Sequence, residues 1–209
     1  MATDRVTGLL LAGGRSKRMG RDKRLLAIGE ETMVGRSFRV LQEAFGPPWV
    51  LVADEQDVEL LTPMLGADAR FLVDARPGSG PLLALSDALG EIEGSYAFLL
   101  ATDMPRITTA FLRDLDRLRR GLAYAPEALV PRSDGFAQVT CAFYRQSLAP
   151  ALRAAADTGG MSLVGWLERP EINVRYIGED ELRALGGRDM FENLNTPFDH
   201  ARYLKGTTT

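Results

Sequence analysis

The sequence predicts an α/β fold with a central, mostly parallel sheet covered by helices on both faces. Apolar runs of strand length alternate with segments of helical periodicity through residues 1–120. The run FLLATD at 98–103 is apolar enough for a strand at the centre of such a sheet. With 209 residues, of which 45% are hydrophobic and 25% charged, the chain has the size and composition of one compact domain.

The expected elements follow one another as strand and helix. Strands are predicted at 5–14, 49–54, 69–75 and 96–105, and helices at 31–45, 57–65, 80–92 and 108–121. Beyond Gly121 the pattern loosens, and we expect two strands around a Ser-Asp-Gly turn within 127–144 and a helix within 145–160 that extend or flank the sheet. No repeat or linker divides the chain, so we predict a single domain at 1–205 and a frayed tail at 206–209.

Charge and cysteine content exclude several functional classes. A net charge of -3 provides no overall field for nucleic acid or for an anionic membrane. Cys141 is the only cysteine, which excludes an internal disulfide and a Cys-based zinc cluster, and we expect it in the core. No apolar run reaches the roughly 18 residues of a membrane span, and no apolar signal region precedes the first strand. We therefore predict a cytoplasmic protein that binds neither nucleic acid nor a membrane.

A glycine-rich, basic segment follows the first strand. In open α/β sheets, ligands bind beyond the carboxyl ends of the strands. Gly13 and Gly14 allow a sharp turn whose free N–H groups point at anionic oxygens. The cations expected around the same space are Arg15, Lys17, Arg18, Arg21, Lys23 and Arg24. The combination predicts a polyphosphate site, although it contains neither a Walker sequence nor the Gly-x-Gly-x-x-Gly fingerprint.

Asp103 is the strongest candidate for a metal ligand. It comes directly after the apolar strand, so its carboxylate should emerge beside the glycine-rich segment. Magnesium is typically held by one or two carboxylates together with substrate phosphates and water. Asp74 ends the run RFLV in the same way, but strand-end aspartates often cap turns.

The segment LAGGRSKRMGRDK at 11–23 resembles the L-A-G-G-x-S-x-R-M-G-x-D-K loop of the nucleotidyltransferases typified by molybdenum cofactor guanylyltransferase. The resemblance extends over nearly the whole chain, through GPLLAL at 80–85, ATDMP at 101–105 and ENLNTPFD at 192–199. It implies a three-layer α/β/α, Rossmann-like nucleotidyltransferase fold, with a nucleotide-binding half at 1–120 and an acceptor-binding half at 121–205. It also implies Mg²⁺-dependent transfer of GMP from GTP to the phosphate of molybdopterin or the molybdenum cofactor, with release of pyrophosphate. Molybdoenzyme-maturation proteins are candidate partners.

The same resemblance implies roles for individual residues. Lys23 and Arg18 would stabilise the α-phosphate and the pyrophosphate, and Asp103 would hold the metal. The implied nucleotide and acceptor contacts are Leu11, Ala12, Gly13, Gly14, Lys23, Asp74, Gly80, Asn193 and Asn195. Backbone groups of 11–13 would read the base, and the two asparagines would face the pterin or the acceptor phosphate, with Thr196 and Pro197 opening a helix. Asp22 is expected to orient Lys23 or Arg24, and His200 to be an ordinary surface residue.

The sequence leaves alternatives open for the identity of the nucleotide and for the reaction. Ala12-Gly13-Gly14 and the Asn-Thr-Pro tail favour GTP, because cytidylyltransferases of the same cofactor tend to read Ala-Ala-Gly. Leu83 and Ala84 depart from the Gly-Pro-Leu-Ala-Gly that is common in the family, which places bulk at a helix start. One alternative is a nucleotidyltransferase that uses CTP or another NTP and a different phosphorylated acceptor. The other is a non-catalytic relative that binds nucleotide or cofactor, against which Lys23 and Asp103 argue.

Overall fold

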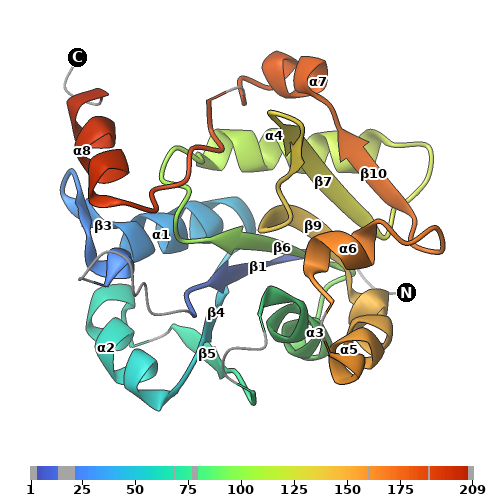
Figure 1. Ribbon diagram of the computed structural model, residues 1–209, viewed down its shortest axis with the longest axis horizontal. Coiled ribbons are helices and arrows are strands. Elements are labelled where there is room, and N and C mark those ends of the chain that lie inside the picture. Colours follow the sequence, from blue (N-terminus) through green and yellow to red (C-terminus); the bar gives the residue numbers. More distant parts are fainter. Residues whose placement is uncertain are drawn as a thin grey trace.

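The structure, a computed structural model, describes residues 4–13, 22–67, 69–76, 80–159, 161–187 and 189–206. Its central sheet has the strand order β10-β7-β9-β6-β1-β4-β5, with β8 paired to β7, and β2 and β3 form a separate two-stranded sheet (Figure 1). The strands are β1 Val6–Leu11, β2 Ala27–Ile28, β3 Glu31–Thr32, β4 Trp49–Val52, β5 Arg70–Val73, β6 Tyr96–Ala101, β7 Ala128–Ser133, β8 Phe136–Ala137, β9 Cys141–Arg145 and β10 Val174–Ile177.

The direction of the strands brings their carboxyl ends to one edge. β1 pairs in parallel with β4 and β6, β4 with β5, and β10 with β7. β9 is antiparallel to both β6 and β7, so β7 again runs in the direction of β6. The chain leaves β1 toward β4 and β5 and then returns to its other side with β6, which makes the end of β1 the switch point where ligands bind in open α/β sheets. The predicted mostly parallel sheet is confirmed.

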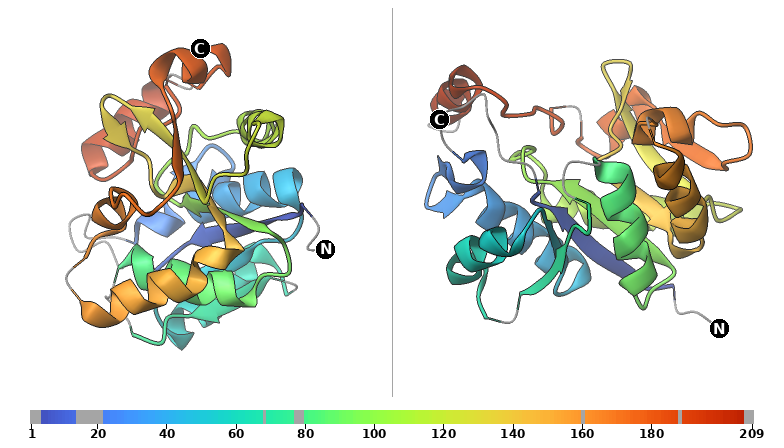
Figure 2. Two further views of the ribbon diagram at one scale, coloured as in Figure 1. Left: turned by 90° about the vertical axis from the view of Figure 1, so that its right-hand side faces the viewer. Right: turned by 60° about the horizontal axis from the view of Figure 1, so that its bottom comes forward.

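Helices cover both faces of the sheet, as Figure 2 shows. The helices are α1 Met33–Phe45, α2 Glu55–Leu65, α3 Pro81–Glu91, α4 Thr109–Gly121, α5 Ala149–Thr158, α6 Leu163–Leu167, α7 Glu179–Ala184 and α8 Pro197–Gly206, with short 3₁₀ turns η1 Lys23–Leu25 and η2 Gln146–Leu148. One core joins the sheet to α1, α2, α4 and α7, and a second joins its other face to α3, α5 and α6. β6 contributes Phe98 and Leu100 to the first core and Ala97 and Leu99 to the second, so it is the buried central strand that the sequence predicts.

A third, small core connects the C-terminal helix to the first half of the chain. Ile28, Met33, Leu194 and Tyr203 pack together, and α8 lies beside β3 in Figure 1. The His200 ring nitrogen Nε2 lies 2.7 Å from the backbone oxygen of Ala27, so this histidine joins α8 to the small sheet instead of facing only solvent. The segment before α8 is thereby held near the switch point.

Two local expectations, the Ser-Asp-Gly turn and the buried cysteine, agree with the structure. The predicted Ser-Asp-Gly turn joins β7 to β8, with positive φ values of 52° at Asp134 and 79° at Gly135 that suit a tight hairpin. Cys141 is fully buried in β9, and burial raises the pKa of its thiol. Gly206, predicted to begin a frayed tail, is instead the last residue of α8, and the rest of that predicted tail, 207–209, lies outside the described residues. None of the described helices is long and apolar enough to cross a membrane.

Candidate active site

An ion pair marks the carboxyl end of β6. The Lys23 ammonium Nζ lies 2.9 Å from Asp103 Oδ2, and both side chains are mostly buried, with 18% and 19% of their surface exposed. Lys23 opens η1 after the glycine-rich segment, whereas Asp103 follows β6, so the fold joins two residues that are 80 positions apart. The structure therefore brings together the two residues that the sequence singled out for phosphate and metal chemistry.

The second oxygen of Asp103 is available for a further ligand. Oδ1 is buried and has no hydrogen-bond partner among the described residues. Leaving a buried carboxylate oxygen unpaired is costly, and such groups in a native protein often meet an ion or a substrate. The described residues contain no cluster of three or more His, Cys, Asp or Glu side chains that could hold a metal. Asp103 thus fits a magnesium site that substrate phosphates and water would complete.

The segment before α8 lies against this pair. The backbone N–H of Leu194 donates a hydrogen bond to the backbone oxygen of Asp103 at 2.9 Å, and Asn195 Oδ1 lies 3.5 Å from Lys23 Nζ. Thr196 and Asp199 cap α8 reciprocally, because each side chain accepts a hydrogen bond from the other's backbone N–H. The predicted helix entry is confirmed, and Asn195 is placed beside Lys23 and Asp103.

Arg24 departs from its expected place around the phosphate site. It is buried, with 1% of its surface exposed, and its guanidinium donates to Asp22, to Asp57 and to the backbone oxygen of Ala12. Burial disfavours its charge, but hydrogen bonds to Asp22 and Asp57 outweigh that effect and raise the pKa of the guanidinium. The expectation that Arg24 faces the phosphates is wrong, and the expected contact of Asp22 with Arg24 is present.

The start of the glycine-rich segment offers fewer free backbone groups than expected. The N–H of Ala12 donates to the backbone oxygen of Leu51 at 2.9 Å, and its own oxygen accepts from Arg24. Leu11 is half-buried at the end of β1, while Gly13 is exposed. Of 11–13, Gly13 is therefore best placed to meet a base. The expected contacts Gly14 and Arg18, and the cations Arg15, Lys17 and Arg21, lie outside the described residues.

Asp74 and Gly80 lie at the same sheet edge, Asp74 directly after β5 and Gly80 directly before α3. Asp74 Oδ1 accepts a hydrogen bond from the backbone N–H of Arg76 at 2.8 Å, so its side chain caps a turn in this structure. Gly80, with φ of 82°, precedes α3 without a side-chain cap, which leaves the helix N-terminus open to an anion. Leu83 and Ala84 are only 1% and 9% exposed, so their bulk lies in the interior of the protein.

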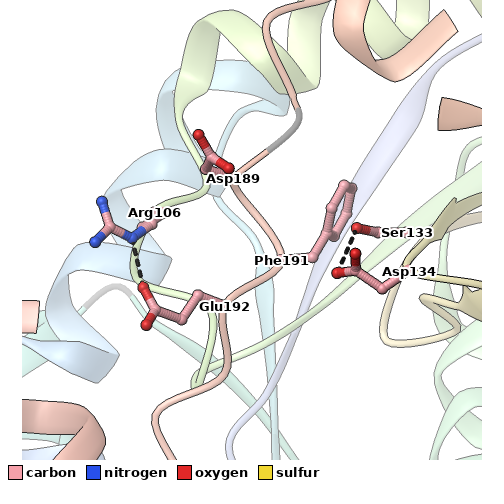
Figure 3. Close-up of a pocket in the computed structure, with 6 residues that line it drawn as sticks. All are labelled: Arg106, Ser133, Asp134, Asp189, Phe191 and Glu192. Carbon is pink, nitrogen blue, oxygen red and sulfur yellow. Dashed lines mark hydrogen bonds and ion pairs between the residues drawn. The ribbon is translucent and has the colours of Figure 1, made fainter. Parts of the chain in front are cut away.

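A pocket of about 490 Å³ lies at the carboxyl end of β7. Its walls come from three segments far apart in sequence: Arg106, Ser133, Asp134, Asp189, Phe191 and Glu192 (Figure 3). Arg106 Nε donates to Glu192 Oε2 at 2.7 Å, and this hydrogen bond, with a second from Arg202, holds the pKa of Glu192 below its ordinary value. Glu192 is two residues from Leu194, so the pocket wall continues directly into the segment that contacts Asp103. The sequence reasoning missed this pocket, because no motif links its three segments.

Comparison with known proteins identifies the family. The family described as the MobA-like NTP transferase domain matches residues 8–171. A protein of Synechococcus elongatus named "Probable molybdenum cofactor guanylyltransferase" is 31% identical over 91% of this chain and 94% of its own length. A protein of the same name from Pelotomaculum thermopropionicum is 31% identical over 93% of this chain and 89% of its own.

A solved structure has the same fold. The molybdopterin-guanine dinucleotide biosynthesis protein A of Archaeoglobus fulgidus superimposes with a TM-score of 0.77 and 25% identity, covering 95% of this chain and 97% of that one. The likeness thus extends over nearly the whole chain. This protein is a nucleotidyltransferase that belongs to the MobA-like NTP transferase family.

Proposed function

We propose that this protein transfers GMP from GTP to the terminal phosphate of molybdopterin or of its molybdenum form, with Mg²⁺, and releases pyrophosphate. The observation that carries the proposal is the Lys23–Asp103 pair at the switch point, with one buried carboxylate oxygen left unpaired. The names of the relatives support the guanylyl group and the acceptor. A single carboxylate beside a lysine suits a reaction in which the substrates bring most of the negative charge.

The chain's residues position and neutralise charge, and no side-chain nucleophile is needed. An oxygen of the acceptor phosphate forms the new bond to the α-phosphorus of GTP, and the bond to the bridging oxygen breaks, so pyrophosphate carries away the electron pair. Bound to Asp103, Mg²⁺ would offset the charge of the phosphates. Lys23 would hold the developing negative charge, and we keep Arg18 as a second donor there. Gly13, Gly14 and the helix start at Gly80 would contact the nucleotide.

We propose that the acceptor lies on the other side of Asp103 from the nucleotide. The 490 Å³ pocket at β7 lies at the same sheet edge, and its volume suits a small heterocyclic ligand. Its wall leads through Glu192 to Asn193 and Asn195, whose amides can donate and accept hydrogen bonds. We propose that the pterin occupies this pocket and that its phosphate lies near Asn195 and Lys23. In that arrangement the acceptor and the nucleotide meet at Asp103.

The first test is thermal unfolding with GTP, CTP, ATP and UTP, each with and without Mg²⁺. Selective binding to the folded state raises the melting temperature. We expect the largest rise with GTP, dependent on Mg²⁺, and loss of that dependence in Asp103→Asn. A larger rise with CTP would instead favour a cytidylyltransferase, and no rise with any nucleotide would contradict the proposal. Formation of the guanine dinucleotide from GTP and molybdopterin then tests the acceptor.

A further inference from the structure

The buried guanidinium of Arg24 joins the two ends of the glycine-rich segment. Nη1 donates to the backbone oxygen of Ala12 at 2.9 Å, where β1 ends. Nη2 donates to Asp22 Oδ2 at 2.6 Å, where η1 begins. The same nitrogen donates to Asp57 Oδ1 in α2 at 2.7 Å, and the other oxygen of Asp57 accepts from the N–H of Ala53 after β4. One side chain therefore fixes both ends of 13–21 to the body of the domain.

Burying a charged side chain at this position costs desolvation free energy. Arg24 and Asp57 have only 2% and 1% of their side-chain surface exposed, and burying such a pair brings little net stability compared with apolar residues of similar volume. The pair instead contributes orientation, because the planar guanidinium holds its three hydrogen-bond partners at defined angles. An apolar side chain at position 24 could fill the space, but it could not hold the Ala12 oxygen and Asp22 together.

Lys23 depends on this arrangement through its own backbone. It lies between Asp22 and Arg24 in the chain, and both neighbours are held by the guanidinium contacts. Its ammonium group reaches Asp103 across the site. The family loop that this chain resembles ends at the lysine, so position 24 is not part of that pattern.

We propose that Arg24 is a positioning residue for nucleotidyl transfer, which holds Ala12 and Asp22 together and thereby fixes the direction of Lys23. The inference rests on the proposed function, since it requires that Lys23 meets the phosphates of GTP. Arg24 itself touches no substrate, because its donors are committed to Ala12, Asp22 and Asp57 inside the protein. It acts on the reaction by keeping Lys23 in register with Asp103.

A matched control lies at the opposite edge of the sheet. Arg119 in α4 is also buried, with 4% of its side chain exposed, and pairs with two carboxylates, Asp116 and Asp4. Asp4 precedes β1, so this cluster lies at the amino ends of the strands, away from the site. Arg24→Met and Arg119→Met each remove one buried guanidinium from two aspartates. Both should lower the melting temperature, but only the first should change catalysis.

The assay is pyrophosphate release from GTP and Mg²⁺ with molybdopterin as acceptor, below the unfolding range of every variant. We expect Arg24→Met to lower kcat by about a hundredfold, the size of effect that a misplacement of about 1 Å can cause. Arg119→Met should keep kcat and KM within about twofold, as expected for a change far from the site. Arg24→Lys, which retains the charge but not the planar fork, should fall between the wild type and Arg24→Met.

A double variant separates folding from positioning. Arg24→Met with Asp57→Asn removes the buried charge that the single variant leaves unpaired, so it should recover stability without recovering kcat. If it, or a folded Arg24→Met, turns over GTP like the wild type, the positioning role is overturned. Wild-type protein that shows neither Mg²⁺-dependent stabilisation by GTP nor turnover would instead overturn the proposed function, and the role of Arg24 with it.

Discussion

The two ends of the candidate site differ in how many of their charged side chains are already paired with other residues. At the end of β1 and β6, Arg24 is held by Asp22 and Asp57, and Lys23 is held by Asp103. At the end of β7, Asp134 and Asp189 are exposed, and the nearest hydrogen bond to Asp134 comes from Ser133 at a long 3.4 Å. The first end is organised before any ligand binds, whereas the second presents open acidic groups.

This difference suits the two tasks that the site would perform. Groups that meet charge developing in a transition state act best when they are fixed beforehand, because they then need no reorganisation during the reaction. A region that only binds an acceptor can keep exposed polar groups that pair when the acceptor arrives. We therefore expect substitutions at the first end to affect kcat and those at the second to affect acceptor binding.

The most severe test of this comparison is Asp103→Asn. Removing the carboxylate charge should lower kcat by about a thousandfold or more, because the metal ligand and the partner of Lys23 are lost together. The unfolding midpoint should change little, since the amide retains the size of the side chain. Turnover and thermal unfolding measured on the same preparation check both statements. Turnover close to that of the wild type would show that the metal is held elsewhere.

Lys23→Met should have the next largest effect. Without the ammonium group we expect kcat/KM for GTP to fall by about a hundredfold, because a charged hydrogen bond to the phosphates is missing in the transition state. Lys205, an exposed lysine at the end of α8, provides the control, and Lys205→Met should behave like the wild type. Equal effects of the two changes on steady-state kinetics would argue against a role for Lys23.

The sequence predicted the first end better than the second for a physical reason. Strand periodicity locates the carboxyl ends of β1 and β6, which places Asp103 at the same edge as the basic segment after β1. The family resemblance then singles out Lys23 within that segment. Side-chain direction within a basic segment has no such rule, so the sequence places Arg24 with the cations around the phosphate site, although the side chain points into the domain. Its partner Asp57 was missed because an aspartate in the first turn of a helix looks like any other helix start.

The second end depends on contacts that no local pattern encodes. Arg106, the β7–β8 hairpin and Phe191 come from three distant segments, and their meeting depends on β9 reversing direction between β6 and β7. The two-residue strands β2 and β3 are too short for periodicity to detect. They matter nonetheless, because their small core with α8 brings Asn195 to Lys23.

A change in the pocket should separate acceptor binding from nucleotide binding. Asp134→Asn keeps the hairpin, since asparagine tolerates a positive φ, but it removes one exposed carboxylate. We expect KM for molybdopterin to change by about tenfold, the scale of one charged hydrogen bond, while the stabilisation by GTP and Mg²⁺ stays the same. Asp180→Asn, on the exposed face of α7, is the control. A changed response to GTP would contradict the division of the site.

The smallest expected effect concerns acid stability at the boundary between the two ends. The hydrogen bond from Arg106, with that from Arg202, keeps the pKa of Glu192 below its ordinary value of 4.5. The carboxylate therefore stabilises the folded state above pH 4.5, and this contribution is lost as the pH falls through the lowered pKa. Glu192→Gln should cost about 1 kcal/mol of unfolding free energy at neutral pH, since the side chain is 22% exposed and partly screened.

Urea unfolding of Glu192→Gln and the wild type at neutral pH, and in steps below pH 4.5, checks this prediction. The two unfolding free energies should converge as the wild-type carboxylate takes up its proton. Glu179→Gln, at the exposed start of α7, serves as the control for removal of one carboxylate at the surface. A difference for Glu192 that stays constant through the acid range would mean that its ion pairs do not stabilise the boundary. Glu192 would then resemble Asp134 and Asp189, whose carboxylates are exposed. The part of the site that is fixed before a ligand binds would extend only as far as Leu194.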